Sequence, residues 1–184
     1  FADILRRNND NIQALSDEII RNLVKYLSAN QAGMFILNDE DKDDIHFELI
    51  SSYAWDRKKF VSKRVEYGEG LVGACALEKE PILMTEVPED YVNITSGLGK
   101  ANPQFVALVP LMHEETILGV LEMASFKVFE KFEIDFLERV AQSIASTILS
   151  VKVNARTKQL LEQSQQQAEE MLAQEEEMRQ NMEE

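Results

Sequence analysis

Apolar and polar residues follow three different patterns along the chain, and each pattern predicts a different kind of structure. In the first 30 residues, apolar side chains recur in steps of three and four, which predicts a helix from residue 1 to about residue 29. From about residue 31 to residue 129, short apolar runs alternate with turn-forming residues, which predicts strands. From about residue 130 onward, helical spacing returns without any proline, which predicts one long helix.

The middle pattern indicates an antiparallel sheet. Its successive apolar runs are AGMFILN, IHFELISSYAW, FVSKRVEY, PILMTEV, QFVALVPLMH and TILGVLEMASF. Short turns join neighbouring runs, as they do in hairpins of antiparallel strands. FVSKRVEY carries charges at alternate positions, so one of its faces is expected to meet water. Residues 89–103 are mostly small or polar and predict a loop.

The last helix loses much of its apolar stripe after Val153. The residues that keep the heptad steps are half polar or small: Thr157, Leu161, Ser164, Ala168, Met171, Glu175, Met178 and Met182. This pattern favours a weak parallel coiled coil that is stabilised by something outside the chain, and the alternative is a frayed tail rich in Gln and Glu. We expect a homodimer whose interface includes residues of both terminal helices: Leu5, Ile12, Leu15, Leu161, Met171 and Met178.

Composition excludes several classes of partner and site. The chain has 184 residues, 45% of them hydrophobic, and a net charge of −14, which predicts neither a nucleic-acid surface nor contact with anionic membrane. One cysteine and two distant histidines predict no disulfide, no metal site and no cofactor. No apolar run has the roughly 20 residues of a membrane span. We expect a cytoplasmic fragment of a longer protein, which could have membrane spans elsewhere.

The stretch YGEGLVGACALEKEP contains a formal G-x-G-x-x-G, in Gly68, Gly70 and Gly73. A dinucleotide-binding loop would need a buried parallel strand before it and a full crossover helix after it. The preceding strand is charged, and Pro81 ends the following helix early. The glycines therefore predict something other than a dinucleotide site.

Several motifs taken together resemble the GAF family of small-molecule sensory domains. The motifs are GEGLVG before a short helix, the Glu80–Pro81–Ile82 strand start, FVALVPL (residues 105–111), ILGVLEM (residues 117–123), and Phe132 with Asp135 opening the closing helix. The resemblance covers roughly residues 15–150. It implies an α+β fold with a central antiparallel sheet, helices on both faces and flanking helices that dimerise. It divides the chain into a helix at 1–30, a GAF-like domain at 31–150 and a coiled-coil linker at 151–184.

A candidate ligand site follows from the hairpin formed by the last two strands. If Glu114 and Glu115 form its tip, so that His113 faces Thr116, one face holds Phe105, Ala107 and Val109 opposite Ala124, Glu122 and Val120. A carboxylate among apolar residues is costly unless it is paired or near water. Glu122 would therefore accept hydrogen bonds from a ligand, or else cap backbone amides or pair with Arg or Lys. The other face of the hairpin would pack on the terminal helices.

Resemblance to cyclic-nucleotide-binding GAF domains, where a matching Glu touches the base, supports the ligand reading. Tyr53 and the loop residues Tyr91 and Thr95 are further candidates for the same site, alongside Phe105 and Ala107. A Tyr at strand spacing is more often a core residue, which is the alternative for Tyr53, and the loop is equally explained as a surface connection. The N-K-x-F-x-D-E pattern of cyclic-nucleotide binders is absent, however, so the ligand class stays open.

No catalytic constellation is evident, and Cys75 is expected to be a buried hydrophobe rather than a nucleophile or chromophore anchor. We therefore expect a non-enzymatic sensory or regulatory domain of a bacterial signalling protein. The resemblance implies a PAS or histidine-kinase-type output domain in the same chain. The alternative is a ligand-free spacer with a degenerate pocket, used for dimerisation and signal relay.

Overall fold

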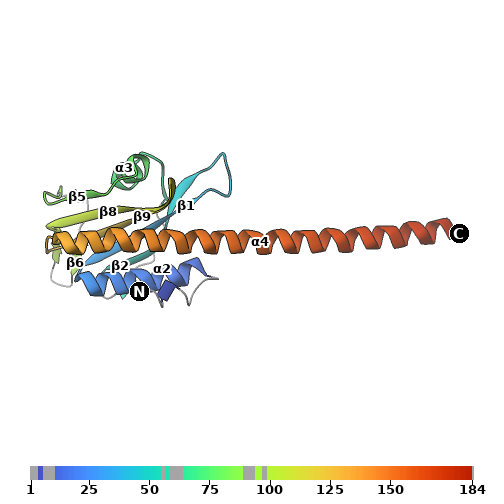
Figure 1. The fold of residues 1–184 in the computed structure, drawn as a ribbon, viewed down its shortest axis with the longest axis horizontal. Coiled ribbons are helices and arrows are strands. Elements are labelled where there is room, and N and C mark those ends of the chain that lie inside the picture. Colours follow the sequence, from blue (N-terminus) through green and yellow to red (C-terminus); the bar gives the residue numbers. More distant parts are fainter. Residues whose placement is uncertain are drawn as a thin grey trace.

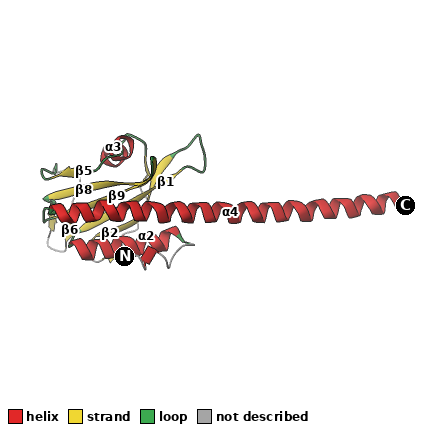
Figure 2. Ribbon diagram, in the orientation of Figure 1, coloured by secondary structure: helices red, strands yellow, loops and turns green. Residues whose placement is uncertain are grey.

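The computed structural model describes residues 4–5, 11–54, 57–58, 64–88, 94–96 and 99–183. A central sheet is covered by helices on both faces, and one helix projects far beyond the sheet (Figures 1 and 2). In chain order the elements are α2 (Ile12–Leu27), β1 (Gln31–Asn38), β2 (His46–Ala54), β3 (Arg57–Lys58), β4 (Arg64–Val65), α3 (Gly70–Glu78), β5 (Ile82–Met84), β6 (Ile94–Ser96), β7 (Gly99–Ala101), β8 (Phe105–His113), β9 (Thr116–Ser125) and α4 (Lys131–Glu183). The α+β architecture predicted from the sequence is confirmed.

The sheet is antiparallel wherever its pairing is described. Its strand order is β3-β2-β1-β9-β8-β5, and β4 also pairs with β2. Helices α2 and α4 cover one face, and α3 covers the other. Within residues 89–103, where a loop was predicted, β6 and β7 form a separate two-stranded hairpin. In the part of the chain that the structure describes, no helix is long and apolar enough to cross a membrane.

Helix α2 begins at its own cap instead of continuing from residue 1. The Asn11 side chain accepts a hydrogen bond from the Ala14 N–H, and the extended backbone of Asn11 marks the start of the helix. The prediction of one helix from residue 1 to about residue 29 was therefore wrong at this point. Ser28 closes the helix in a left-handed conformation.

The apolar stripe of α2 packs on the sheet of its own chain. Leu15, Ile19 and Leu23 are fully buried in the cluster between α2, α4 and the sheet. Leu15 was predicted to lie at a dimer interface, but its complete burial within one chain leaves it no surface to offer a partner. The prediction failed because a core-facing helix and a coiled-coil helix repeat their apolar residues at nearly the same spacing. Leu5 and Ile12 are partly buried against the same cluster.

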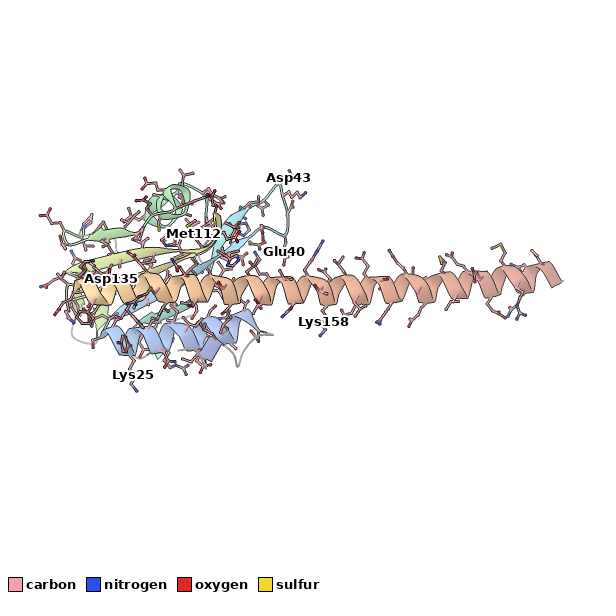
Figure 3. All side chains as sticks on the ribbon, viewed as in Figure 1. Lys25, Glu40, Asp43, Met112, Asp135 and Lys158 are labelled. Atoms are coloured by element: carbon pink, nitrogen blue, oxygen red, sulfur yellow. The ribbon has the colours of Figure 1, made fainter. Side chains whose placement is uncertain are left out.

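Helix α4 is continuous over 53 residues, as the absence of proline predicted. Its inner segment, 131–152, packs on β8 and β9 through residues that recur every three or four positions: Leu137, Val140, Ile144, Ile148 and Val151. The described side chains of its outer segment, 153–183, are exposed, and this part of the helix extends away from the sheet (Figure 3). A rise of about 1.5 Å per residue makes this outer segment roughly 46 Å long.

The β8–β9 hairpin differs from the predicted register by one residue. His113 pairs with Thr116 as expected, and Glu114 takes a left-handed turn conformation. Pairing then shifts between Leu111 and Met112, and Leu118 is the extra residue, a β-bulge. Beyond the bulge, each residue of β8 and the β9 residue that was expected to oppose it therefore lie on opposite faces of the sheet. Gly119, next to the bulge, has no room for a side chain, because a Cβ there would lie 2.3 Å from the Phe35 carbonyl oxygen of β1.

Candidate functional site

Glu122 lies in the middle of the sheet on the face that α3 covers. Strand β9 runs between β1 and β8, and Glu122 pairs with Gly33 on one side and Leu108 on the other. The surrounding apolar cluster joins the sheet to α3, through Leu108, Val106, Val120 and Ala124 and through Val72, Cys75 and Ala76 of the helix. Glu122 is partly buried and takes part in an interaction within the chain. Gly33 has no side chain, and a Cβ there would lie 3.2 Å from the Leu49 side chain and 3.5 Å from the Phe35 ring.

The structure separates Glu122 from the residues predicted to share its site. Phe105 and Ala107 are buried in the cluster on the other face, against α2 and α4, so the prediction that they line one cavity with Glu122 was wrong. The cause is the bulge at Leu118, which shifts the pairing of β8 with β9 by one residue. Tyr53 is also packed against the α2–α4 cluster. The side chains that do share the face of Glu122 are its neighbours in the strand pair, Val106 and Leu108.

Two predicted site residues cannot be placed beside Glu122. Tyr91 lies outside the described residues. Thr95 is in β6, where its backbone pairs with Lys100 of β7, and its side chain is not described. Their assignment to a ligand site stays a prediction.

The glycine-rich stretch forms a tight turn into α3, and a close backbone approach explains its sequence. Gly68 and Gly70 have positive φ angles of 76° and 58°. A Cβ at Gly73 would lie 2.4 Å from the Glu66 carbonyl oxygen. The turn can therefore pack this closely against the helix only because residue 73 is glycine. The neighbouring strands are antiparallel, which removes the geometry that a dinucleotide loop requires.

The family model of the GAF domain matches residues 9–149 of this chain. The chain belongs to the GAF domain family. The resemblance inferred from the motifs is thereby confirmed, and it extends over both the sheet and the helices that flank it. No curated protein matches the chain in sequence.

Solved structures similar to this GAF domain come from several functional backgrounds. The GAF domain of a phosphoenolpyruvate-protein phosphotransferase from Coxiella burnetii is 19% identical, with a TM-score of 0.63, over 84% of this chain and 96% of that one. The corresponding Acinetobacter domain is 14% identical, with a TM-score of 0.61, over 83% and 92%. A free methionine-R-sulfoxide reductase from Neisseria meningitidis is 15% identical, with a TM-score of 0.64, over 83% and 86%. At these identities the likeness shows the fold alone.

The single cysteine of the GAF domain is in an environment that suppresses its reactivity. Cys75 is fully buried on the sheet-facing side of α3, and its thiol is 3.4 Å from the Glu80 carbonyl oxygen. Burial raises the pKa of the Cys75 thiol to about 12, so the reactive thiolate is disfavoured at neutral pH. Among the described residues, no three His, Cys, Asp or Glu side chains gather as a metal ion would require.

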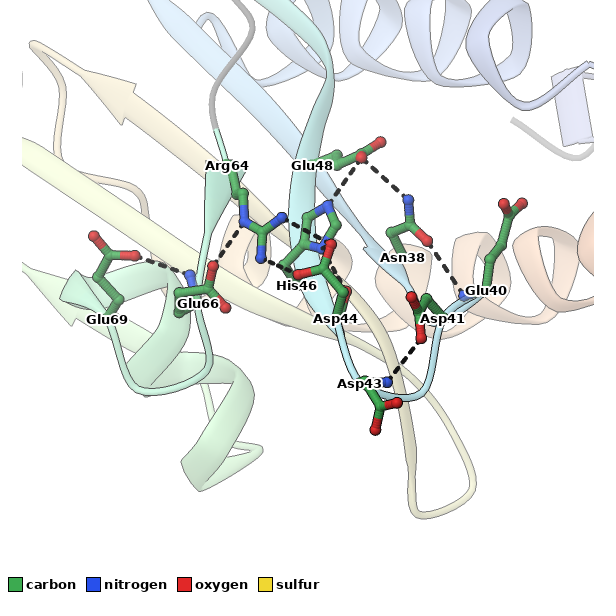
Figure 4. Close-up of polar contacts among 10 residues, drawn as sticks. All are labelled: Asn38, Glu40, Asp41, Asp43, Asp44, His46, Glu48, Arg64, Glu66 and Glu69. Atoms are coloured by element: carbon green, nitrogen blue, oxygen red, sulfur yellow. Dashed lines mark hydrogen bonds and ion pairs between the residues drawn. The ribbon is translucent and has the colours of Figure 1, made fainter.

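A buried histidine organises a charged cluster where the end of β1, the start of β2 and β4 lie side by side (Figure 4). His46 is 7% exposed, with Nδ1 2.7 Å from the Asp44 carbonyl oxygen and Nε2 3.0 Å from Glu48 Oε1. Both partners are acceptors, so both ring nitrogens can donate only in the protonated imidazolium. The hydrogen bond to the Asp44 carbonyl, and then that to Glu48, raise the pKa of His46.

The same cluster reaches the turn before α3. Arg64 forms a bidentate ion pair with the Asp44 carboxylate. Its Nε also donates a hydrogen bond to Glu66 Oε1 at 2.7 Å. The Arg64 guanidinium lowers the pKa of Asp44, and the carboxylates of Asp44 and then Glu66 raise the pKa of Arg64. The Glu66 N–H in turn donates to Glu69 Oε2 at 2.9 Å, and Glu69 is the cap of α3.

The cluster also reaches α4 at the point where that helix leaves the domain. Asn38 donates to Glu48 Oε1 at 3.1 Å, and the next residue, Asp39, forms an ion pair with Lys152. Lys152 also donates to the Leu37 carbonyl oxygen at 2.9 Å. Sequence analysis missed this cluster because it joins residues from β1, β2, β4 and α4. The only local signal was the alternation of His46 and Glu48 beside an acidic loop.

Proposed function

We propose that this chain is a regulatory GAF domain of a larger signal-transduction protein, which binds a small molecule on the α3 face and relays the change through α4. The observation that carries the proposal is the position of Glu122. It lies on one face of β9, and residues of β8 and β9 on the other face, such as Leu121 and Met123, pack in the cluster beneath α4. A ligand that moved β9 would therefore act on α4 through one layer of backbone.

The ligand class that fits this position is a small molecule with an N–H or amine group, because Glu122 offers a carboxylate among apolar side chains. For relay, the domain needs two states that differ in the placement of α4, and the ligand must favour one of them. The exposed outer segment of α4 would carry the change onward. By resemblance we propose a homodimer through the terminal helices, with a PAS or kinase-type output domain in the same bacterial, cytoplasmic chain.

A second candidate function is a spacer without a ligand, which only pairs two chains and transmits a signal from a neighbouring domain. One observation favours it: Glu122 already takes part in an interaction within the chain, and an ionised carboxylate that is satisfied needs no ligand. In this case the α3 face is a packed core, and the outer segment of α4 keeps its role.

We propose a non-catalytic role in either case. Free methionine-R-sulfoxide reductases share the fold, so the fold by itself admits an enzyme. Catalysis by a thiol needs an accessible thiolate, whereas Cys75 is buried and its pKa is raised.

A thermal-shift screen against a metabolite library that includes cyclic nucleotides and amino acids tests the proposal. A true ligand raises the melting temperature of the wild type, and raises it less in Glu122→Gln. Glu114→Gln is the matched control, because it removes the same charge at the tip of the β8–β9 hairpin. A hit that shifts all three proteins equally contradicts a site at Glu122. A screen without hits, together with unchanged stability of Glu122→Gln, favours the spacer.

A further inference from the structure

The distal end of the β8–β9 hairpin is held from both faces of the sheet. Helices α3 and α4 cover opposite faces, and the hairpin lies between them (Figure 1). Next to the tip, Ile117 is buried in the cluster beneath α3, and Met112 packs against that cluster. Leu111 and Leu118 are buried in the cluster beneath α2 and α4. The apolar residues near the tip therefore divide between the two helical layers.

The tip itself contacts both helices through polar groups. On the α3 side, Lys79 Nζ donates a hydrogen bond to the Glu115 carbonyl oxygen at 2.7 Å. On the α4 side, His113 Nδ1 lies 3.2 Å from Ser146 Oγ. The Ser146 hydroxyl gives its one proton to the Gln142 carbonyl oxygen at 3.1 Å, so His113 is the donor in the second contact. Together the Lys79–Glu115 and His113–Ser146 contacts connect α3 to α4 by way of the hairpin tip, and they form a tip bridge.

The α3 side of the tip bridge joins two backbone positions that residues with a side chain rarely adopt. Lys79 has a φ of 58° and caps the C-terminus of α3. Glu114 has a φ of 54° and makes the turn immediately before Glu115. A left-handed conformation is unfavourable for a residue with a Cβ, and such residues cluster where a structure switches between states. Among the described residues three other than glycine have a positive φ, and two of them meet at this contact.

The residues of the tip bridge lie at the surface, so its contacts can form and break without opening the core. Lys79, Glu115 and Ser146 are exposed, and His113 is partly buried. Exposed polar contacts each contribute little to stability. A strained turn held by weak contacts on two sides suits an element with two states, whose balance depends on the position of α3.

Helix α3 connects the tip bridge to the proposed ligand face. This helix covers the face of the sheet that holds Glu122, and Cys75 of α3 packs on that face. The Lys79 N–H donates to the Cys75 carbonyl oxygen at 2.9 Å, so a displacement of α3 moves Lys79 with it. At the other end of the bridge, Ser146 lies about two helical turns before Lys152, which bonds to the Leu37 carbonyl oxygen where α4 leaves the domain.

We propose that the tip bridge is a regulatory element, which transmits displacement of α3 to the turn of α4 around Ser146. The inference rests on the proposed function, because it supplies a second route from the same ligand face to the same helix. The route through β9 passes across the middle of the sheet, whereas the tip bridge passes around β8 and β9 at their hairpin. It acts close to the point where the outer segment begins.

Amide hydrogen exchange of the full chain tests the tip bridge as a double-mutant cycle. Lys79→Met removes the donor and keeps the apolar stem, so exchange in residues 143–149 should rise about threefold. In Ser146→Ala the α4 end of the bridge is already cut, so the same substitution should add almost nothing, because linked contacts are not additive. Lys25→Met is the matched control, since it removes the same charge from an exposed position on α2 and should leave residues 143–149 unchanged.

The amides of residues 32–36 in β1 report global stability in the same samples. A rise confined to α3 and the hairpin tip, or an equal rise in residues 32–36 and 143–149, would overturn the proposal. So would an effect of Lys79→Met on α4 that persists undiminished in Ser146→Ala, because that effect would travel through the sheet.

The cycle uses no ligand, so its failure and the failure of the proposed function are distinguishable. Coupling between Lys79 and Ser146 without a hit in the metabolite screen would keep the tip bridge and remove the ligand. A hit that depends on Glu122, without coupling in the cycle, would keep the ligand site and leave β9 as the route to α4.

Discussion

The inner and outer segments of α4 form one continuous helix but are held by different forces. The inner segment, 131–152, buries seven apolar residues in the cluster beneath it, and near its start Glu133 accepts a hydrogen bond from the Glu130 N–H at 2.8 Å. The outer segment, 153–183, has exposed side chains throughout its described part. Secondary structure alone does not distinguish the two. What distinguishes them is whether this chain supplies a surface on which the apolar residues of the segment pack.

The largest expected effect is on folding, from the inner segment. Ile144 is fully buried between α4 and the sheet, so Ile144→Ala should lower the free energy of unfolding by about 2–5 kcal/mol. Met178→Ala, in the outer segment, should change it by less than about 0.5 kcal/mol at concentrations where the chain is monomeric. Urea denaturation at low protein concentration measures both. A large loss in Met178→Ala would mean that the outer segment is not independent of the domain.

A smaller effect is expected at the boundary between the segments. Lys152→Met removes the ion pair with Asp39 and the hydrogen bond to the Leu37 carbonyl oxygen while it keeps an apolar stem. Lys152 is partly exposed, so the loss should be about 1 kcal/mol. Amide exchange should rise in residues 148–152 and stay unchanged around Ile144. Lys158→Met, in the outer segment, is the control. Equal protection in the two variants would show that Lys152 does not anchor the helix.

The sequence predicted those parts of the molecule whose pattern had only one solution. The strands at 31–38, 46–54 and 105–125 alternate or run apolar between turn residues, and the proline-free stretch after residue 130 could only be one helix. The sequence pattern did not determine which surface the apolar face of each helix contacts. Leu15 belongs to the domain core and Met171 to the exposed outer segment, yet both recur at the same spacing. Which surface a stripe meets is decided by tertiary structure, which periodicity does not contain.

The candidate site depended on a feature that the pattern hides. In TILGVLEM nearly every residue is apolar, so an extra residue at Leu118 leaves no visible break in alternation. A shift of one residue exchanged the faces of Phe105 and Ala107 but kept Glu122 on the side of α3. The His46 cluster was hidden for a different reason: Asp44 and Arg64 are 20 residues apart and meet only because β4 pairs with β2.

The smallest expected effect depends on pH and concerns the loop that holds Lys152 in place. His46 has a raised pKa in the folded chain, so its contribution to stability is fully present below the ordinary value of 6.5 and is lost as pH rises through the higher folded value. The groups facing it are Asp44, Glu48 and Arg64. The carboxyl pKa values of Asp44 and Glu48 are lowered, so these groups stay ionised throughout this window.

The free energy of unfolding of the wild type should therefore decline from pH 6.5 upward, whereas His46→Gln should show a flatter profile. Asn38 links Glu48 of this cluster to the strand end that carries Asp39, so amide exchange near Lys152 should rise with the same pH dependence, beyond the intrinsic rise of exchange with pH. His113→Gln is the control, because His113 lies at the hairpin tip beside Ser146, outside the cluster. A decline that persists in His46→Gln and disappears in His113→Gln would assign the titration to His113 and contradict this prediction. A decline lost only in His46→Gln would show that the inner segment is anchored through a protonated histidine, whereas the outer segment is indifferent to it.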